Sequence, residues 1–167
     1  NPALFYWACG SLSAMLDNAP TYVSFLTTIF GVFIEPDHVA AVQEMVKNGG
    51  QAVALAGGGD SSVITNTYAA LKQYHPALLA SGNVSFEQVE MAYLIGNLNL
   101  NLYLVAISVG SVFFGAATYI GNGPNFMVKA IADQNKVHTP TFLGFIFKFS
   151  LPFLLPVLVL IWLIFFR

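Results

Sequence analysis

The chain has 167 residues, of which 56% are hydrophobic and 8% charged, and its formal net charge is −2. Soluble domains average about 25% charged residues, so this composition predicts an integral membrane protein rather than a soluble domain. The small net charge gives no reason to expect a nucleic-acid partner. The single cysteine, Cys9, excludes an internal disulfide framework and cannot form a metal site alone.

Residues 1–34 are apolar apart from one acid, Asp17. The two arms on either side of it are each short for a membrane crossing, which needs roughly 20 apolar residues. Asp17, Asn18 and Pro20 between the arms favour a turn. We therefore expect a re-entrant helical hairpin over residues 1–34 with its tip inside the membrane. The alternative is a single kinked helix that crosses once.

Residues 35–92 are predicted to form an extramembrane helical insert, because acidic residues and glycines are concentrated there. Breaks are expected at Asn48–Gly50 and Gly57–Asp60. Ser85 and Gln88 have the spacing of a capping box. Three helices are expected in this insert, at Asp37–Lys47, Ser62–Tyr74 and Ser85–Ala92.

Residues 93–136 are predicted to form a broken transmembrane helix. No charged residue lies between Met91 and Val128, a stretch too long for one straight span. Gly121–Asn125 supplies the interruption: its two glycines permit positive φ, and its proline suits the first turn of a following half-helix. That half-helix is expected to reach the surface at Lys129.

Residues 137–167 are predicted to form a short interfacial helix, at Leu143–Phe149, followed by the last transmembrane helix, at Phe149–Phe166. Pro152 and Pro156 are expected to bend the first half of this last helix.

Lysines predict the orientation of the chain. They outnumber acids between Lys129 and Lys148, which places that segment in the cytoplasm. The insert then lies on the opposite face, and the hairpin enters and leaves from outside.

Asp17 is the candidate ion ligand of the hairpin tip. A carboxylate within a membrane is costly unless it faces protein or water, and it can bind a cation or carry a proton. Asn18, Thr21 and unwound backbone carbonyls can add the oxygens that suit Na⁺. The alternative is that Asp17 only caps the second arm of the hairpin.

The second candidate site is the helix interruption, where polar side chains stand next to broken backbone. The half-helix that starts there directs its positive dipole end at the break, which suits an anion, and the preceding half-helix ends in carbonyls, which suit a cation. The alternative is a hinge whose amides only satisfy broken backbone. The candidate binding residues are Thr118, Gly121, Asn122, Gly123 and Asn125.

Both motifs resemble known transporter sequences. Residues 13–20, Ser-Ala-Met-Leu-Asp-Asn-Ala-Pro, resemble the Ser-Ala-x-x-Asp-Asn-x-Pro signature of NhaD-type sodium/proton antiporters. Residues 117–132 are similar to the second-repeat helix break of the branch described as citrate transporters or sodium:proton antiporters. Both groups belong to the ion transporter superfamily.

The resemblance implies a fold of two inverted repeats, each with a re-entrant hairpin and a broken helix. It implies a bacterial inner-membrane protein that assembles as a homodimer in the lipid bilayer. The chain is then expected to be a C-terminal fragment, with the N-terminal half of the same transporter as its partner.

The resemblance also bears on the transported substrate. Dicarboxylate carriers of the superfamily have Ser-Asn-Thr at their hairpin tips, whereas Asp17–Ala19 places an acid where an anion would be repelled. The expected function is therefore sodium/proton antiport by alternating access, with a cation-coupled citrate or dicarboxylate symporter as the alternative. No enzymatic activity is expected, and no cofactor besides the transported Na⁺ and H⁺.

Overall fold

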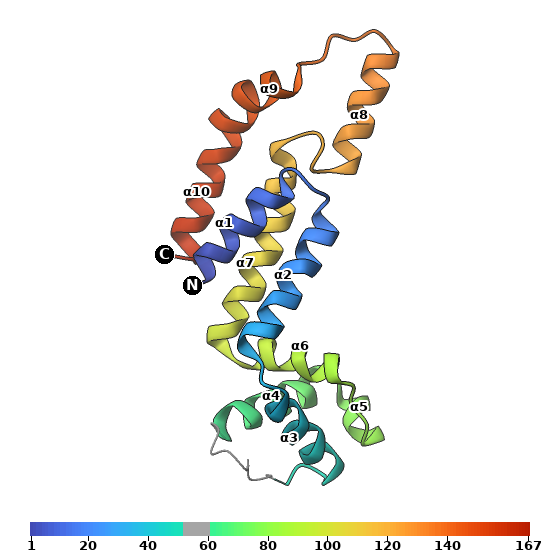
Figure 1. Ribbon diagram of the computed structural model, residues 1–167, viewed down its shortest axis with the longest axis vertical. Coiled ribbons are helices and arrows are strands. Elements are labelled where there is room, and N and C mark those ends of the chain that lie inside the picture. Colours follow the sequence, from blue (N-terminus) through green and yellow to red (C-terminus); the bar gives the residue numbers. More distant parts are fainter. Residues whose placement is uncertain (52–60) are drawn as a thin grey trace. The chain divides into compact units, whose positions relative to one another are not determined.

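A computed structural model describes residues 1–51 and 61–167, and every regular element in these two ranges is helical (Figure 1). The all-helical prediction is therefore confirmed for them. The expected break at Gly57–Asp60 lies outside the described residues. Two compact units are formed, one by residues 1–27 and 105–167 and the other by residues 28–104.

In residues 28–104, the helices expected at Asp37–Lys47 and Ser62–Tyr74 are present to within one residue at each end. The helix expected at Ser85–Ala92 extends to Gly96, and a further helix at Pro76–Ser81 was not expected. Ser85 and Gln88 form the expected capping box: Ser85 Oγ accepts from the backbone N–H of Gln88 (3.3 Å), and Gln88 Oε1 accepts from that of Ser85 (2.9 Å). Gly49, just beyond the third helix, has a φ of 66°. The bounds are α3 Pro36–Lys47, α4 Ser61–Tyr74, α5 Pro76–Ser81 and α6 Phe86–Gly96.

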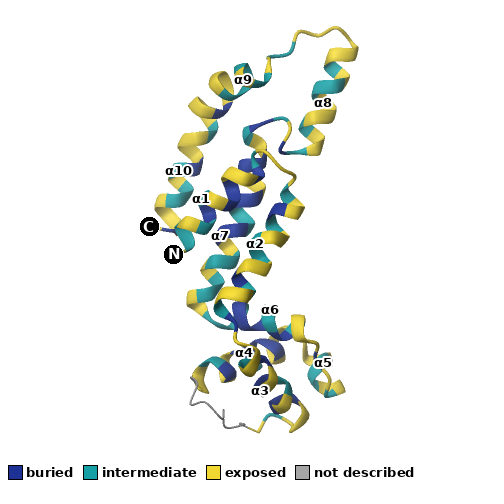
Figure 2. Cartoon of the chain, viewed as in Figure 1, coloured by how far each residue is buried: buried dark blue, intermediate teal, exposed yellow. Residues whose placement is uncertain are grey.

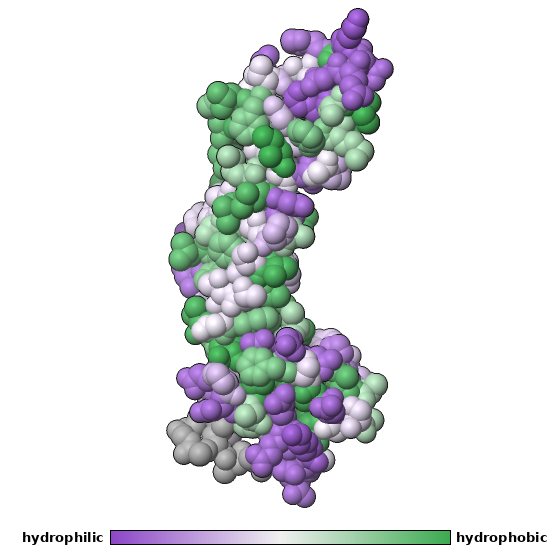
Figure 3. All heavy atoms as spheres, turned by 45° about the vertical axis from the view of Figure 1, so that its right-hand side comes forward, coloured by the Kyte–Doolittle hydropathy of each residue, from purple (hydrophilic) through white to green (hydrophobic). Residues whose placement is uncertain are grey.

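This unit has its own apolar core. Gly96 of α6 lies so close to α4 that a Cβ atom there would be 2.6 Å from the carbonyl oxygen of Asn66. Figure 2 shows the buried residues on the facing sides of these helices, and Figure 3 shows hydrophilic side chains over their outer surface. The core includes Val39, Val42, Ile64, Leu71, Val89 and Leu94.

The chain begins with a helical hairpin. Its arms are α1 (Pro2–Ser13) and α2 (Asn18–Phe33), and the residues between them are not helical. The ring of Phe5 packs against that of Phe25 at 6.0 Å between centroids. Since these residues lie far from the turn on opposite arms, the contact excludes the alternative of one kinked helix.

The predicted broken helix is also present. α7 (Leu98–Phe114) continues through the 3-10 turn η1 (Gly115–Ala117), after which the chain is irregular until α8 (Gly123–Gln134) begins. Asn122 is the N-cap of α8, and Pro124 stands in its first turn, as expected.

The last helix is longer than predicted. α9 (Phe142–Phe145), the π-helical segment η2 (Ile146–Leu154) and α10 (Leu155–Phe165) follow one another without a break. The helix expected separately at Leu143–Phe149 is therefore continuous with the last helix. Its start is fixed by Thr141, whose Oγ1 accepts from the backbone N–H of Gly144 (3.2 Å).

Two helices of the described part of the chain are long and apolar enough to cross a membrane. They are Leu98–Ala117, with 20 residues, and Phe142–Phe165, with 24. A third candidate is the pair α2 and α3, which meets this criterion only when taken together and is bent by 88° between its helices. A span interrupted by such a bend is either broken or re-entrant.

Aromatic packing joins α1, α7 and the last helix in the unit of residues 1–27 and 105–167. Tyr6 is fully buried, and its hydroxyl donates to the carbonyl oxygen of Leu158 (3.0 Å). Its ring contacts those of Trp7, Phe114 and Phe166. Edge-to-face ring pairs stabilise such a cluster beyond the area they bury. This packing holds the hairpin and the broken helix side by side.

Candidate functional site

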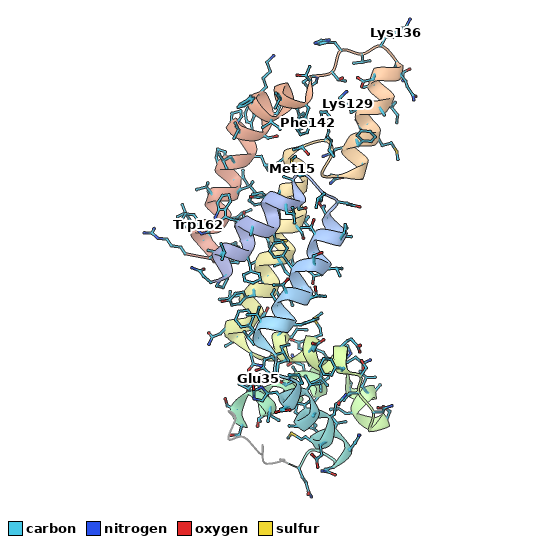
Figure 4. All side chains as sticks on the ribbon, in the orientation of Figure 1. Met15, Glu35, Lys129, Lys136, Phe142 and Trp162 are labelled. Atoms are coloured by element: carbon cyan, nitrogen blue, oxygen red, sulfur yellow. The ribbon has the colours of Figure 1, made fainter. Side chains whose placement is uncertain are left out.

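The hairpin tip lies against the broken helix. Ser13, the last residue of α1, is fully buried, and its hydroxyl donates to the carbonyl oxygen of Ser111 in α7 (2.6 Å). Met15, labelled in Figure 4, marks this tip beside the helix break. The two polar motifs of the sequence are therefore neighbours in space, although about 100 residues separate them.

Asn18 has three acceptors around its side-chain amide. With its nitrogen turned toward them, Nδ2 lies 2.7 Å from Ser13 Oγ, 2.9 Å from the carbonyl oxygen of Ser111 and 3.1 Å from that of Gly121. Ser13 gives its own proton to Ser111, so its oxygen accepts from Asn18. One amide thus connects both arms of the hairpin tip with α7 and with the irregular segment after it.

Thr118 makes the second connection. Its side chain is buried, and Oγ1 donates to the carbonyl oxygen of Ala14 in the hairpin tip (2.6 Å). The same oxygen accepts from the backbone N–H groups of Ile120 (3.2 Å) and Gly121 (3.0 Å). A single hydroxyl therefore satisfies broken backbone on both sides of the contact.

Glycines permit the close approach of the tip to the break. A Cβ atom on Gly121 would lie 2.6 Å from the carbonyl oxygen of Ser13 and 2.7 Å from that of Ala14, and one on Gly115 would overlap the Asn18 amide. Neither Gly121 nor Gly123 uses the positive φ that glycine permits. Gly121 is required here for space rather than for an unusual backbone angle.

Asp17 lies immediately before α2 and is exposed. Its Oδ1 accepts from the backbone N–H of Asn18 (2.8 Å), and its carbonyl oxygen accepts from the hydroxyl of Thr21 (3.0 Å). Thr21 itself is buried. Asp17 Oδ1 thus bonds the N–H of the first residue of α2 rather than that of the second or third, which a capping side chain usually bonds, and its carboxylate stays at the surface of the hairpin tip.

Asn122 carries a buried oxygen, Oδ1, that has no hydrogen-bond partner among the described residues. The residue precedes α8, but its side chain does not cap that helix. A buried unpaired acceptor is costly, so such an atom indicates a donor or a cation that completes it.

The other two predicted residues of the break lie apart from the tip. Gly123 is exposed and has open space around it. Asn125 lines a cavity of about 370 Å³ between α8 and the start of the last helix, together with Tyr119, Lys129 and Thr139. The structure thus brings together Asn18, Thr118 and Gly121, but it does not bring Gly123 or Asn125 to the same contact.

Lys129 stands at the edge of this cavity. Its ammonium pairs with Asp133 (2.5 Å), lies 3.4 Å from Thr139 Oγ1 and sits 5.2 Å from the ring centre of Tyr119. Figure 4 shows Lys129 on α8, and Figure 3 shows hydrophilic residues gathered around the end of α8 and the loop after it.

Sequence reasoning did not identify Ser111 or Gly115 as part of this contact, nor Ser150, whose hydroxyl donates to the carbonyl oxygen of Ala117 at the end of η1 (2.5 Å). Ser111 and Ser150 lie in apolar helices, where a single serine is common. The residues next to Gly115 in the sequence give no sign of its role. Their importance depends on packing between distant segments. Among the described residues, no group of three or more His, Cys, Asp or Glu side chains could hold a metal ion.

A family model described as "Putative citrate transport" matches residues 1–166. Searches of curated proteins and of solved structures found no match to the chain.

Proposed function

Because the chain belongs to this citrate transport family, within the ion transporter superfamily, we propose that it forms part of a secondary transporter that exchanges Na⁺ for H⁺ by alternating access. Membership of a transport family favours a carrier over an enzyme, and together with the two candidate spans it indicates a membrane protein. The identity of the transported ion, its coupling to protons and the residues that bind it are what we propose.

One observation carries the proposal: the hairpin tip and the helix break are joined through Asn18 and Thr118. Irregular backbone at membrane depth is tolerated where it is buried in protein or lines a water-filled cavity. Transporters commonly place substrate and ion sites at such interruptions, where carbonyls at the end of one half-helix coordinate a cation. α7 with η1 ends at this contact, and α8 begins beyond it.

The oxygens near the contact support a cation as cargo. Asn122 Oδ1 is a buried acceptor without a partner, and Asp17 brings a carboxylate to the hairpin tip. Na⁺ prefers hard oxygen ligands, and a carboxylate can hold either a cation or a proton. Competition between Na⁺ and H⁺ for Asp17 would couple the two fluxes. Thr21 and Gly121 would support the site from either side, while Gly123 and Asn125 would act outside the contact, with Asn125 lining the cavity beside Lys129.

The family description supports a second candidate function, cation-coupled uptake of citrate or a related carboxylate. The cavity beside Lys129 is the feature that would suit an anion. Asp133 already neutralises that ammonium, however, so its attraction for an anion is weakened.

Ion flux in vesicles that contain the full protein separates the two functions. Antiport predicts that an inward Na⁺ gradient drives protons out, with no dependence on citrate. Symport predicts Na⁺-driven citrate uptake without Na⁺-driven proton movement, and that result would replace the proposal. We further propose that the working protein is an inner-membrane homodimer in which a second, N-terminal repeat completes the site and the hairpin is re-entrant.

A further inference from the structure

Hydroxyl groups in the helices of this chain follow two patterns. Most donate to a carbonyl of their own helix, one turn back, as Thr27 does to Val23 (3.1 Å) and Thr67 to Val63 (2.7 Å). This is the ordinary behaviour of serine and threonine within a helix. Ser150 is different, because its hydroxyl donates to the carbonyl oxygen of Ala117, 33 residues earlier (2.5 Å).

Ala117 is the last helical residue before the break. Carbonyls at a helix C-terminus have no partner within the helix and must find one elsewhere. Ser150 supplies that partner from the last helix. The next residue, Thr118, is bonded to the hairpin tip through Ala14. Ala117, at the end of the first half-helix, is therefore bonded to the last helix, and Thr118, the next residue, is bonded to the hairpin tip.

Ser150 lies on the buried face of the last helix. Ser150 is 8% exposed in a helix whose surface is mostly exposed, as Figure 2 shows for η2 and α10. Leu154, Leu158 and Trp162 follow Ser150 on the same face of the helix, and they belong to or pack against the aromatic core. Ser150 is thus the polar member of the packed face of this helix.

Ser150 also lies inside the π-helical segment. The N–H of Leu155 bonds to the carbonyl oxygen of Ser150, five residues back, and Pro152 has no N–H to offer to the usual pattern. π-helical turns are rare and are often found at functional sites. Here the widened turns surround the serine that bonds to Ala117.

We propose that Ser150 is a positioning residue for transport: it fixes the carbonyl end of the first half-helix and thereby the cation geometry of the break. This inference deepens the proposed antiport and rests on it. Without the hydroxyl, the Ala117 carbonyl loses its partner and the end of the half-helix is less well fixed. The expected consequence is weaker cation binding rather than slower movement of the bound state.

The test compares Ser150→Ala, Ser150→Thr and the control Thr27→Ala in the full protein reconstituted into vesicles. Thr27 is exposed, and its hydroxyl donates to the carbonyl oxygens of Val23 and Ser24 in its own helix. An interhelical hydrogen bond in a membrane corresponds to about a three- to tenfold change in binding. Ser150→Ala should raise the half-saturating Na⁺ concentration by about that factor with little change in maximal flux. Ser150→Thr and Thr27→Ala should resemble the wild type.

An unchanged half-saturating Na⁺ concentration in Ser150→Ala would overturn the inference, and so would an equal loss in Ser150→Thr. If Ser150→Ala does not accumulate, Ser150→Cys keeps the volume with a weaker donor and should give a smaller shift; no shift counts against the proposal.

Hydrogen exchange of the peptide over residues 115–121 separates this inference from the proposed function. If the wild type shows no Na⁺-driven proton flux, antiport is wrong, but faster exchange in Ser150→Ala than in Thr27→Ala would still support the positioning role. Equal exchange in the two variants would refute it.

Discussion

The two units of the chain use their polar side chains in different ways. In residues 28–104, the hydroxyls of Ser85 and Thr67 bond within their own helices, and a bond between segments comes from an amide, that of Gln43, which donates to the carbonyl oxygen of Val84 (3.0 Å). In residues 1–27 and 105–167, Ser13, Thr118 and Ser150 donate to carbonyls of other segments. The first pattern stabilises individual helices. The second fixes segments that are distant in sequence around one break, as a binding site requires.

The largest effect is expected from crowding the contact between tip and break. Gly121→Val should lower the free energy of unfolding by about 3 kcal/mol or more, because the new Cβ overlaps the carbonyls of Ser13 and Ala14. Thermal unfolding of the purified protein and vesicle flux would measure the loss. Gly31→Val is the matched control, since nothing lies within 4 Å of a Cβ atom at Gly31 and this residue is not in the proposed site. Similar losses in both variants would show that the close approach is not the cause.

Removing the bridging hydroxyl should have the next largest effect. Thr118→Val keeps the shape of the side chain but leaves the Ala14 carbonyl and the N–H groups of Ile120 and Gly121 without this partner. Leaving such groups unsatisfied costs about 1–3 kcal/mol. Thr118→Ser keeps the hydroxyl and should remain near wild type in thermal unfolding. A Thr118→Val protein as stable as Thr118→Ser would contradict the role of this bridge.

In the other unit, loss of a cap should give a smaller and purely local effect. Ser85→Ala removes the capping box of α6 and should cost about 1 kcal/mol, without changing ion flux. The pKa of Glu87 is lowered by its own backbone N–H and then by the Ser85 hydroxyl. The stabilisation linked to Glu87 is therefore present at neutral pH and is lost as the pH falls through that lowered pKa. Chemical denaturation with and without the substitution would check both, and Ser81→Ala is an exposed serine control.

The smallest effect is expected at the ion pair on α8. Lys129→Met removes the pair with Asp133, but both side chains reach solvent, so thermal unfolding of the purified protein should change little. A large loss of stability would indicate that the pair holds α8 against Thr139 and the following loop. Lys136→Met provides the comparison, because Lys136 is exposed in the same segment.

Local rules predicted most helices of this chain but only part of the contact. Proline, glycine and capping residues predicted the ends of α3, the C-terminal end of α4 and the starts of α6 and α8, because those signals act within a few residues, but they did not predict α5 or the end of α6. Asn18, Thr118 and Gly121 were identified because polar or flexible residues are conspicuous in apolar surroundings.

The remaining features could not be predicted from residues close together in the sequence. Ser111 contributes only a backbone carbonyl, and Ser150 is one hydroxyl in a long apolar run. Pro152 was correctly placed inside the last helix, but the joining of Leu143–Phe149 to that helix and its π-helical pattern around Pro152 were missed, because neither has a signal in nearby residues.

Ion binding and helix capping by Asp17 can be separated by experiment, because the two roles respond differently to substitution. Asparagine caps a helix about as well as aspartate does, whereas alanine caps it poorly. Asparagine and alanine both lack the charge of aspartate. Na⁺-driven proton flux should be measured for Asp17→Asn and Asp17→Ala in vesicles with equal amounts of protein, with Asp37→Asn, the acid in the first turn of α3, as control. The proposed ion site predicts that both Asp17 variants lose the flux and that Asp37→Asn keeps it. Flux retained in Asp17→Asn and lost in Asp17→Ala would mean that Asp17 only caps α2, and it would contradict the account.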